Sequence, residues 1–233
     1  MGEKTGNVVE LESFLAEFVS PHLRAAGFRK SAHTFRRRQP NGDEAAMQFR
    51  AWPMARLCSF LFDIWITIEP WWDLRHFNPD RPKPYPARTH TYDATFQRQA
   101  RMPELDDPWS SHGAFWAFDE SASRDQVGHQ IQDLVLGHVL ADVEVALDRG
   151  SLLEAAANKV PILGHTPRSE HLHRALLVDA GPSDELDEVL LALEPNNEQD
   201  AQFASWSAAR LLDGPTWRAL TQDVDREDPQ HLG

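Results

Sequence analysis

Apolar side chains recur every three or four positions near the start of the chain, on the stripe formed by Val8, Leu11, Phe14, Leu15, Phe18, Val19 and Leu23. This spacing predicts a helix with one buried face over residues 8–26. Pro21 lies inside the stripe and is expected to kink the helix, or to restart it with Ser20 as the new N-cap. Gly27 follows the last periodic residue and is placed for a left-handed C-terminal cap.

Alternation of apolar and polar residues, which is typical of strands, marks the segments 28–38, 47–52, 60–68, 92–98 and 114–118. Asn41-Gly42 lies between the first two of these segments and is a strong hairpin signal. The clearest alternation runs from Phe60 to Ile68. We expect this segment to be a central strand, packed on at least one side by a helix.

Prolines then crowd the stretch from residue 70 to residue 90, at Pro70, Pro79, Pro82, Pro84 and Pro86. Proline removes a backbone donor and clashes with the preceding helical turn, so this stretch is expected to form a long ordered loop rather than a helix. Long loops in compact domains often carry function.

The second part of the chain has the spacing of helices. One long helix is expected from Ser123, as its N-cap, to a stop at Gly150. Shorter helices are expected over 151–159, 169–180, 183–194, 198–212 and 215–223. The sequence therefore predicts an α+β fold. Residues 1–150 would form a domain with an antiparallel sheet and covering helices, and residues 151–233 an acidic, all-helical domain.

Charge narrows the classes of function. The 233 residues include 23 Lys and Arg and 36 Asp and Glu, a net charge of −13. Residues 1–150 contribute 17 − 21 = −4 and residues 151–233 contribute 6 − 15 = −9. This deficit disfavours a nucleic-acid binder, which needs a strongly positive face. The acidic surplus suits a basic protein partner, although it can equally serve solubility.

Apolar runs, the single cysteine and the spacing of histidines bear on the compartment of the protein and on whether it binds a metal or cofactor. We find no apolar run of the length that spans a membrane, and we expect a cytoplasmic protein without membrane contact. The single cysteine, Cys58, excludes an intramolecular disulfide and is expected to be a small buried apolar residue. His171 and His173 are two positions apart on an expected helix, so their side chains diverge. We therefore expect no metal and no cofactor.

A basic cluster on the hairpin strands is the first candidate for chemistry, with Arg36, Arg38 and Arg50 as its main members. Guanidinium groups brought onto one surface suit a phosphate or a carboxylate. Charged residues also protect an exposed strand edge and pair with nearby acids, and this second interpretation is the one we favour.

Tryptophans are the second candidate, namely Trp52, Trp65, Trp71, Trp72 and Trp109. Tryptophan and arginine are favoured anchors of protein interfaces. The competing interpretation is that the proline-rich loop folds back over the open face of the sheet and uses these rings as the core beneath a lid.

One stretch resembles a known family. A helix that ends in Leu23-Arg24-Ala25-Ala26-Gly27-Phe28-Arg29-Lys30 is followed by Thr34-Phe35-Arg36-Arg37 and by a strand with Gln48-Phe49. This order resembles the bacterial family called domain of unknown function 4304. The resemblance covers about the first third of the chain, and after Ile64 the chain departs from the family pattern. It implies an α+β domain, no catalytic residues to carry over, and a gene context of immunity to polymorphic toxins.

Two hypotheses of function follow. The first is a non-enzymatic binding protein, an immunity-type inhibitor that neutralises a basic toxin by covering it. The alternative is an enzyme or sensor that binds a small anionic ligand between the Pro/Trp loop and the basic hairpin, with Arg36, Arg38 and Arg50 holding the anion.

Overall fold

The computed structural model describes residues 6–54, 57–81, 83–100, 115–119, 121–165, 170–194 and 196–213. Its strands are β1 (Arg29–Ser31), β2 (Thr34–Arg38), β3 (Glu44–Met54), β4 (Leu57–Thr67), β5 (Phe96–Ala100) and β6 (Trp116–Phe118). Its helices are α1 (Gly6–Phe14), α2 (Ser20–Ala25), α3 (Glu69–His76), α4 (Ser121–Leu134), α5 (Leu140–Leu147), α6 (Arg149–Ala157), α7 (Glu170–Ala180), α8 (Asp184–Leu191) and α9 (Glu198–Asp213). Within these residues no helix is long and apolar enough to cross a membrane.

The strands form one antiparallel sheet in the order β1-β2-β3-β4-β5, with β6 paired to the same edge of β4 as β5. β3 and β4 are the longest pair, in a register that places Met47 opposite Ile64. The sheet and helices confirm the α+β class, and β4 confirms the central strand expected from Phe60 to Ile68. Gly42 has a positive φ of 96° between β2 and β3, as the hairpin signal predicts.

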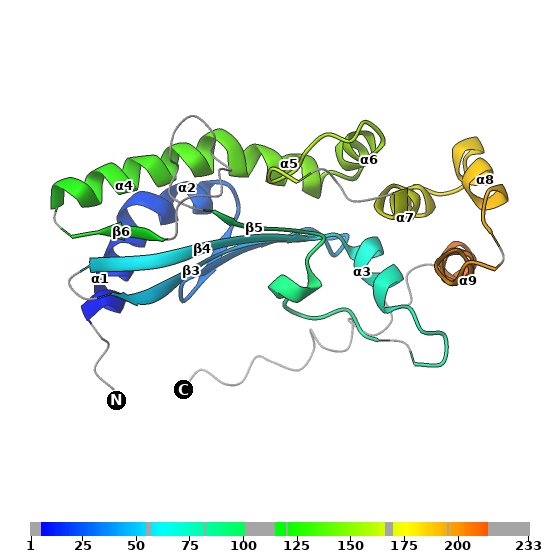
Figure 1. Ribbon diagram of the computed structural model, residues 1–233, viewed down its shortest axis with the longest axis horizontal. Coiled ribbons are helices and arrows are strands. Elements are labelled where there is room, and N and C mark those ends of the chain that lie inside the picture. The colour runs from blue at the N-terminus through cyan, green and yellow to red at the C-terminus, as the bar shows by residue number, and fades with distance from the viewer. Residues whose placement is uncertain are drawn as a thin grey trace.

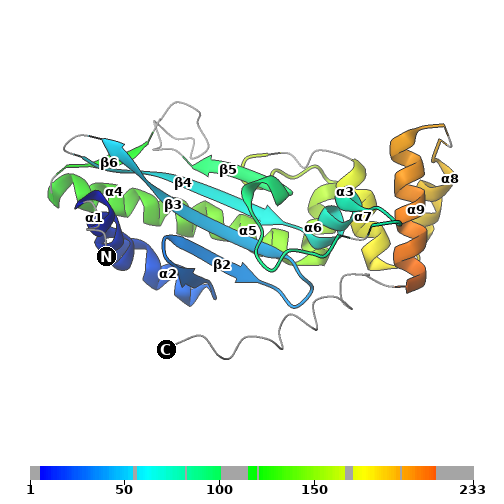
Figure 2. The same cartoon turned by 90° about the horizontal axis from the view of Figure 1, so that it is seen from below.

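Helices cover one face of this sheet. Figure 1 shows α2, α4 and α5 above the strands, and Figure 2 shows the same sheet from below with α4 and α5 behind it. The inward residues of the strands and helices share one large apolar cluster, which includes Phe14, Phe60, Phe62 and Ile131. Because burial of apolar surface is the main stabilising term, this layer holds the fold together. The other face of the sheet carries polar residues.

The first helix differs from expectation at Pro21. Residues Leu15–Val19 form a π-helical turn, in which the N–H of Ser20 donates to the carbonyl of Leu15. Ser20 itself has helical dihedral angles (φ −59°, ψ −39°), so its expected role as N-cap is wrong. The π-helical turn lets Pro21 enter the first turn of α2 without breaking the helix. Gly27 has a φ of 84° and confirms the expected C-terminal cap.

Two further expectations are corrected. Residues 69–76 form α3, where a loop was predicted, because Pro70 occupies the first turn, where a helix needs no proline N–H. Gly150 is not a helix stop. The stop lies at Asp148, whose extended backbone ends α5 and whose side chain accepts a hydrogen bond from the N–H of Ser151 to begin α6.

The remaining helices follow the prediction. α7 and α8 lie within the expected ranges, and α9 extends one residue beyond its expected end. Ser183 caps α8 by accepting from the N–H of Leu186 at 3.1 Å. The expected helix over 215–223 lies outside the described residues. The large apolar cluster continues past residue 150 as far as Leu176. A second cluster joins α3 to α7, α8 and α9 through Leu74, Ala175, Leu177, Val178, Leu186, Phe203 and Trp206.

Candidate binding sites

Arg36 lies on the polar face of the sheet, and its guanidinium is bound by other residues of the protein. Its Nη1 donates to Oε1 of Glu44 and, at 2.9 Å, to the carbonyl of Thr89. The guanidinium also lies 5.3 Å from the centroid of the Trp65 ring. Glu44 is buried and accepts from the Thr89 hydroxyl at 2.7 Å. The charge of Arg36 is therefore neutralised, and it fastens the loop before β5 to the sheet.

Arg38 has the same function one position further along the face. Its Nη1 donates to the carbonyls of Pro86 and Ala87 at 3.3 and 2.7 Å. Its guanidinium lies 5.0 Å from the centroid of the Tyr85 ring. Tyr85 is buried, and this burial raises the pKa of its hydroxyl. The proline-rich segment is thus tied to the hairpin by an arginine that the sequence analysis assigned to a ligand.

Arg50 lies further along the face and pairs with a carboxylate. Its Nε donates to Oδ2 of Asp63 at 2.7 Å, and Gln99 donates to Oδ1 of the same group at 3.1 Å. The side chain of Arg50 is 49% exposed. Arg36, Arg38 and Arg50 therefore have separate partners and do not converge on a shared anion site. For Arg36 and Arg50 this geometry matches the interpretation in which the basic residues pair with nearby acids, whereas Arg38 binds backbone carbonyls.

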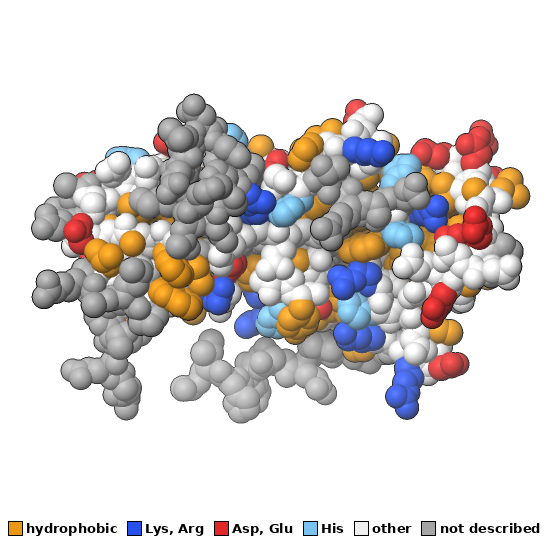
Figure 3. Space-filling model, in the orientation of Figure 1, with side chains coloured by type: hydrophobic (Ala, Val, Ile, Leu, Met, Phe, Trp, Pro, Cys, Tyr) orange, Lys and Arg blue, Asp and Glu red, His pale blue; other side chains and the backbone are white. Residues whose placement is uncertain are grey.

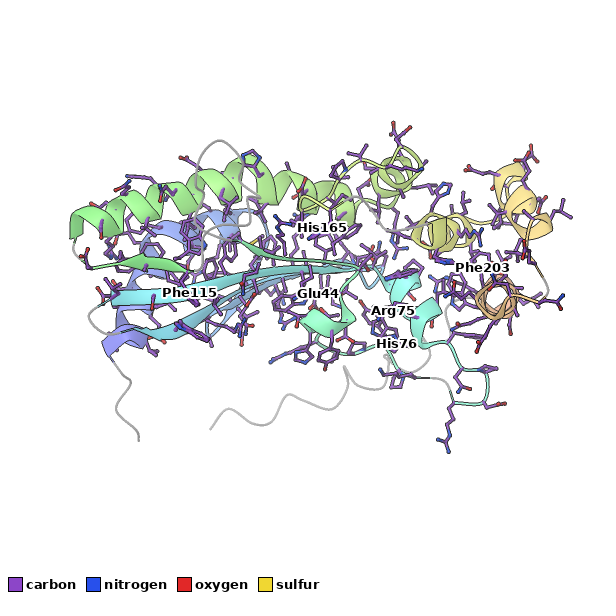
Figure 4. All side chains as sticks on the ribbon, viewed as in Figure 1. Glu44, Arg75, His76, Phe115, His165 and Phe203 are labelled. Atoms are coloured by element: carbon purple, nitrogen blue, oxygen red, sulfur yellow. The ribbon has the colours of Figure 1, made fainter. Side chains whose placement is uncertain are left out.

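The tryptophans separate into two groups. Trp65 and Trp72 are buried, and their indole N–H groups donate to the Thr89 hydroxyl and to Asp93, both at 3.2 Å. These two rings form core beneath the proline-rich segment. Trp52 is 41% exposed and stacks on Phe115 at 5.1 Å between ring centroids, at the end of the sheet labelled by Phe115 in Figure 4.

Trp71 is half-buried on α3, where it packs against both apolar clusters. Trp109 lies outside the described residues. Among the tryptophans that the structure describes, Trp52 and Trp71 are therefore the ones that retain a surface for contacts. They lie on different elements, β3 and α3, so they do not form one continuous anchor.

A buried ionic cluster, which no pattern in the sequence predicts, joins the sheet to α6, α7 and α9. Arg149 contacts Asp43 and Asp179 through its Nε and Nη atoms. Arg210 contacts Glu69, Asp73 and Asp179. Asp43, Glu69 and Arg210 are all buried. We call these six residues the Arg149/Arg210 cluster. Its members come from the hairpin, α3, α6, α7 and α9, so no sequence spacing reveals it.

The charges in this cluster are unequal, because two guanidiniums face four carboxylates. Burial raises the pKa of Asp43 and of Glu69, since the surrounding protein disfavours the ionised form more than the arginines favour it. Burial by itself lowers the pKa of Arg210, but hydrogen bonds to Glu69 and Asp179 outweigh this effect and the net direction is upward. The cluster therefore favours the charged form of Arg210 and disfavours the ionised forms of Asp43 and Glu69.

A cavity of about 200 Å³ lies between α3, α7 and α9 and is lined by Trp71, Leu74, Arg75, His171, Gln199, Gln202 and Phe203. Figure 4 shows Arg75 on α3 and Phe203 on α9 beside it. Walls of apolar rings with a few polar groups are typical of small-molecule sites. A second, more open hollow lies beside the hairpin turn and Asp148, but its arginine, Arg149, already binds Asp43.

An acidic surface covers the end of the molecule formed by α8 and the turn into α9. Its carboxylates, all exposed, belong to Asp184, Glu185, Asp187, Glu188, Glu194 and Glu198. Figure 3 shows these acidic side chains gathered at the end of the molecule that carries α8. His173 approaches Glu185 at 3.3 Å, and α8 itself contains no Lys or Arg. We call these six residues the α8 acidic surface.

Across the described ranges, no group of three or more His, Cys, Asp or Glu side chains is placed to hold a metal ion. Comparisons with family models, with curated proteins and with solved structures find no match to this chain. The resemblance of the first third to the family of domain of unknown function 4304 therefore stays a prediction.

Proposed function

We propose that this protein is a non-enzymatic binding protein that covers a basic protein partner with its α8 acidic surface. The observation that carries the proposal is the charge of that surface. It has six exposed carboxylates, and the arginines of α7 and α9, Arg174 and Arg210, pair with Asp200 and with the acids of the Arg149/Arg210 cluster. The local field is therefore negative, and such a field accelerates association with a cationic partner.

An apolar anchor lies within reach of the same surface. Leu191, the last residue of α8, is 86% exposed. Interfaces combine an apolar centre with a polar rim, and a leucine beside carboxylates fits a partner whose own apolar residue is surrounded by lysine or arginine. In this proposal α8 and the start of α9 carry the binding surface. The protein is an immunity-type inhibitor that holds a toxin in the cytoplasm.

The alternative, a small anion held between the Pro/Trp loop and the basic hairpin, has less support. Arg36 and Arg38 already bind Glu44, Thr89, Pro86 and Ala87. A ligand there would have to displace these contacts before it could gain its own. Arg50 is half exposed but pairs with Asp63, so only the part of its guanidinium that does not bind Asp63 remains for a ligand.

The test compares two variants with equal changes of charge. The first removes the acids of α8, with the substitutions Asp184→Asn, Glu185→Gln, Asp187→Asn and Glu188→Gln. The control removes four exposed acids elsewhere, with the substitutions Glu10→Gln, Asp125→Asn, Asp133→Asn and Glu154→Gln. A toxin encoded beside the gene is the probe, with its binding and cell survival as readouts.

We expect the first variant to lose at least about tenfold in affinity and to lose protection, because several rim charges act together on association. The control should keep both, and salt should weaken the wild-type complex. Equal loss in both variants, or no protection by the wild-type protein, would refute the proposal.

A further inference from the structure

The cavity between α3, α7 and α9 is held in shape by contacts outside it. On α3, Glu69 and Asp73 bind Arg210 of α9, and Asp179 of α7 binds the same guanidinium. Trp206 of α9 donates to Asp73 at 3.0 Å. On α3 and α9, residues that line the cavity lie close in sequence to these contacts. On α7 the lining residue is His171, and nearby Arg174 donates to Asp200 of α9 at 3.0 Å. The three walls are therefore fixed before any ligand enters, which lowers the entropic cost of binding.

The walls of this cavity combine apolar side chains with polar groups. Trp71, Leu74 and Phe203 supply the apolar part, and Phe203 is only 1% exposed. Arg75, His171, Gln199 and Gln202 supply the polar part. Gln202 is held in place because its amide donates to the carbonyl of Leu74 at 3.2 Å. The arrangement suits a ligand with a flat apolar body and one polar end.

Arg75 determines the sign of that polar end. It lies exposed in the last turn of α3, and within the part of the chain that the structure describes no carboxylate forms an ion pair with it. This differs from Arg174 and Arg210, which are engaged by Asp200 and by the Arg149/Arg210 cluster. A planar guanidinium without an acid partner beside an apolar cavity favours a planar anion such as a carboxylate, which it binds with two parallel hydrogen bonds.

We propose that this cavity is a binding site for a small aromatic monocarboxylate. The carboxylate pairs with the Arg75 guanidinium, the ring lies against Trp71 and Phe203, and the amide of Gln199 lies at the rim. A doubly charged phosphate fits less well, because the cavity offers one arginine, one histidine and two neutral amides within a protein of net charge −13. The volume of about 200 Å³ is below that of drug-sized sites and limits the ligand to roughly a single ring.

This site is independent of the basic partner proposed above. Its test uses the whole chain, with sodium benzoate as the probe. Benzamide has nearly the same shape without the charge and serves as the neutral comparison. Binding is measured by saturation-transfer NMR and by the melting temperature at millimolar ligand. We expect benzoate to bind and to raise the melting temperature, and benzamide to bind at least about tenfold more weakly.

Three variants locate the site. Arg75→Gln should weaken benzoate binding roughly 10- to 100-fold, the ratio expected when one charge-assisted pair is lost. Gln199→Trp should abolish binding by filling the cavity from an exposed position that does not disturb the core. Arg81→Gln changes an exposed arginine of the turn after α3 and should leave binding unchanged. Equal binding of benzoate and benzamide, no binding of either, or full affinity in Arg75→Gln would overturn the proposal.

Discussion

Arg210 of α9 donates to both carboxylate oxygens of Glu69 at the start of α3, at 2.9 and 2.6 Å. The two residues are 141 positions apart in the sequence, and both are buried. A buried guanidinium contributes through the groups that would be left without a partner if it were removed. The pair therefore fixes α9 to the start of α3, which follows the central strand β4.

Replacing Arg210 should destabilise the protein strongly. Arg210→Met keeps much of the apolar stem but leaves Glu69, Asp73 and Asp179 without their shared cation, so we expect a loss of about 3–5 kcal/mol in the free energy of unfolding. Arg174→Met is the control, because its partner Asp200 also accepts from the backbone N–H of Glu194, and about 1 kcal/mol is expected there. Urea denaturation measures both. Equal losses would contradict a dominant role for Arg210.

Two glycines of the long α4–α5 helix should respond in opposite directions to alanine. A Cβ at Gly128 would lie 2.4 Å from Cδ1 of Phe18, so Gly128→Ala should cost roughly 1–3 kcal/mol through overpacking. A Cβ at Gly137 meets nothing within 4 Å, and Gly137→Ala should stabilise the helix by up to about 1 kcal/mol. Thermal unfolding of both variants checks this pair. Stabilisation by Gly128→Ala would show that α4 and the first helix, which carries Phe18, do not pack this closely.

His76 should make stability depend on pH. Burial lowers the pKa of His76, and the nearby charges of Lys83 and Arg75 lower it further. As the pH falls below 6.5, His76 therefore gains a proton in the unfolded chain before it does so in the folded protein. The stability that the neutral His76 allows above pH 6.5 is lost as the pH falls through the lower pKa of the folded state. His76→Phe keeps a ring against Trp72 and should flatten the profile between about pH 7 and 5. Denaturation at several pH values tests this, and an unchanged profile in the variant would speak against it.

Cys58 should resist modification in the folded protein. The thiol is 3% exposed in β4, and burial raises its pKa to about 12. Since the thiolate is the reactive form, iodoacetamide at pH 8 should label native protein slowly and urea-unfolded protein quickly. Mass spectrometry counts the single adduct. Rapid labelling of the native protein would mean that β4 opens locally at this end.

Much of the fold could be predicted because it follows from local periodicity. The stripe ending at Leu23, the Asn41-Gly42 turn and the alternation through β4 each depend on neighbours in sequence, and each appears as expected. The helix that begins at Glu69 could not be predicted, because a proline in the first turn of a helix and a proline in a loop look the same in the sequence.

The candidate sites were harder to predict because they depend on contacts distant in sequence. Arg36 and Arg38 are basic residues on a hairpin by sequence, yet their partners come from residues 44 and 86–89. Arg75 differs from these two arginines, because among the described residues no carboxylate forms an ion pair with it. No local pattern distinguishes an arginine that fastens a loop from one that faces a cavity. The difference appears only when the chain is folded.

The π-helical turns at Leu15–Val19 and Val135–Val139 also bear on how chain length can change. A π-helical turn holds one residue more than an α-helical turn, while the helix on either side keeps its orientation. The two turns are therefore the places where the helices can lose one residue and keep the same inward faces toward the sheet. Related chains one residue shorter in either helix should have their alignment gap at these turns.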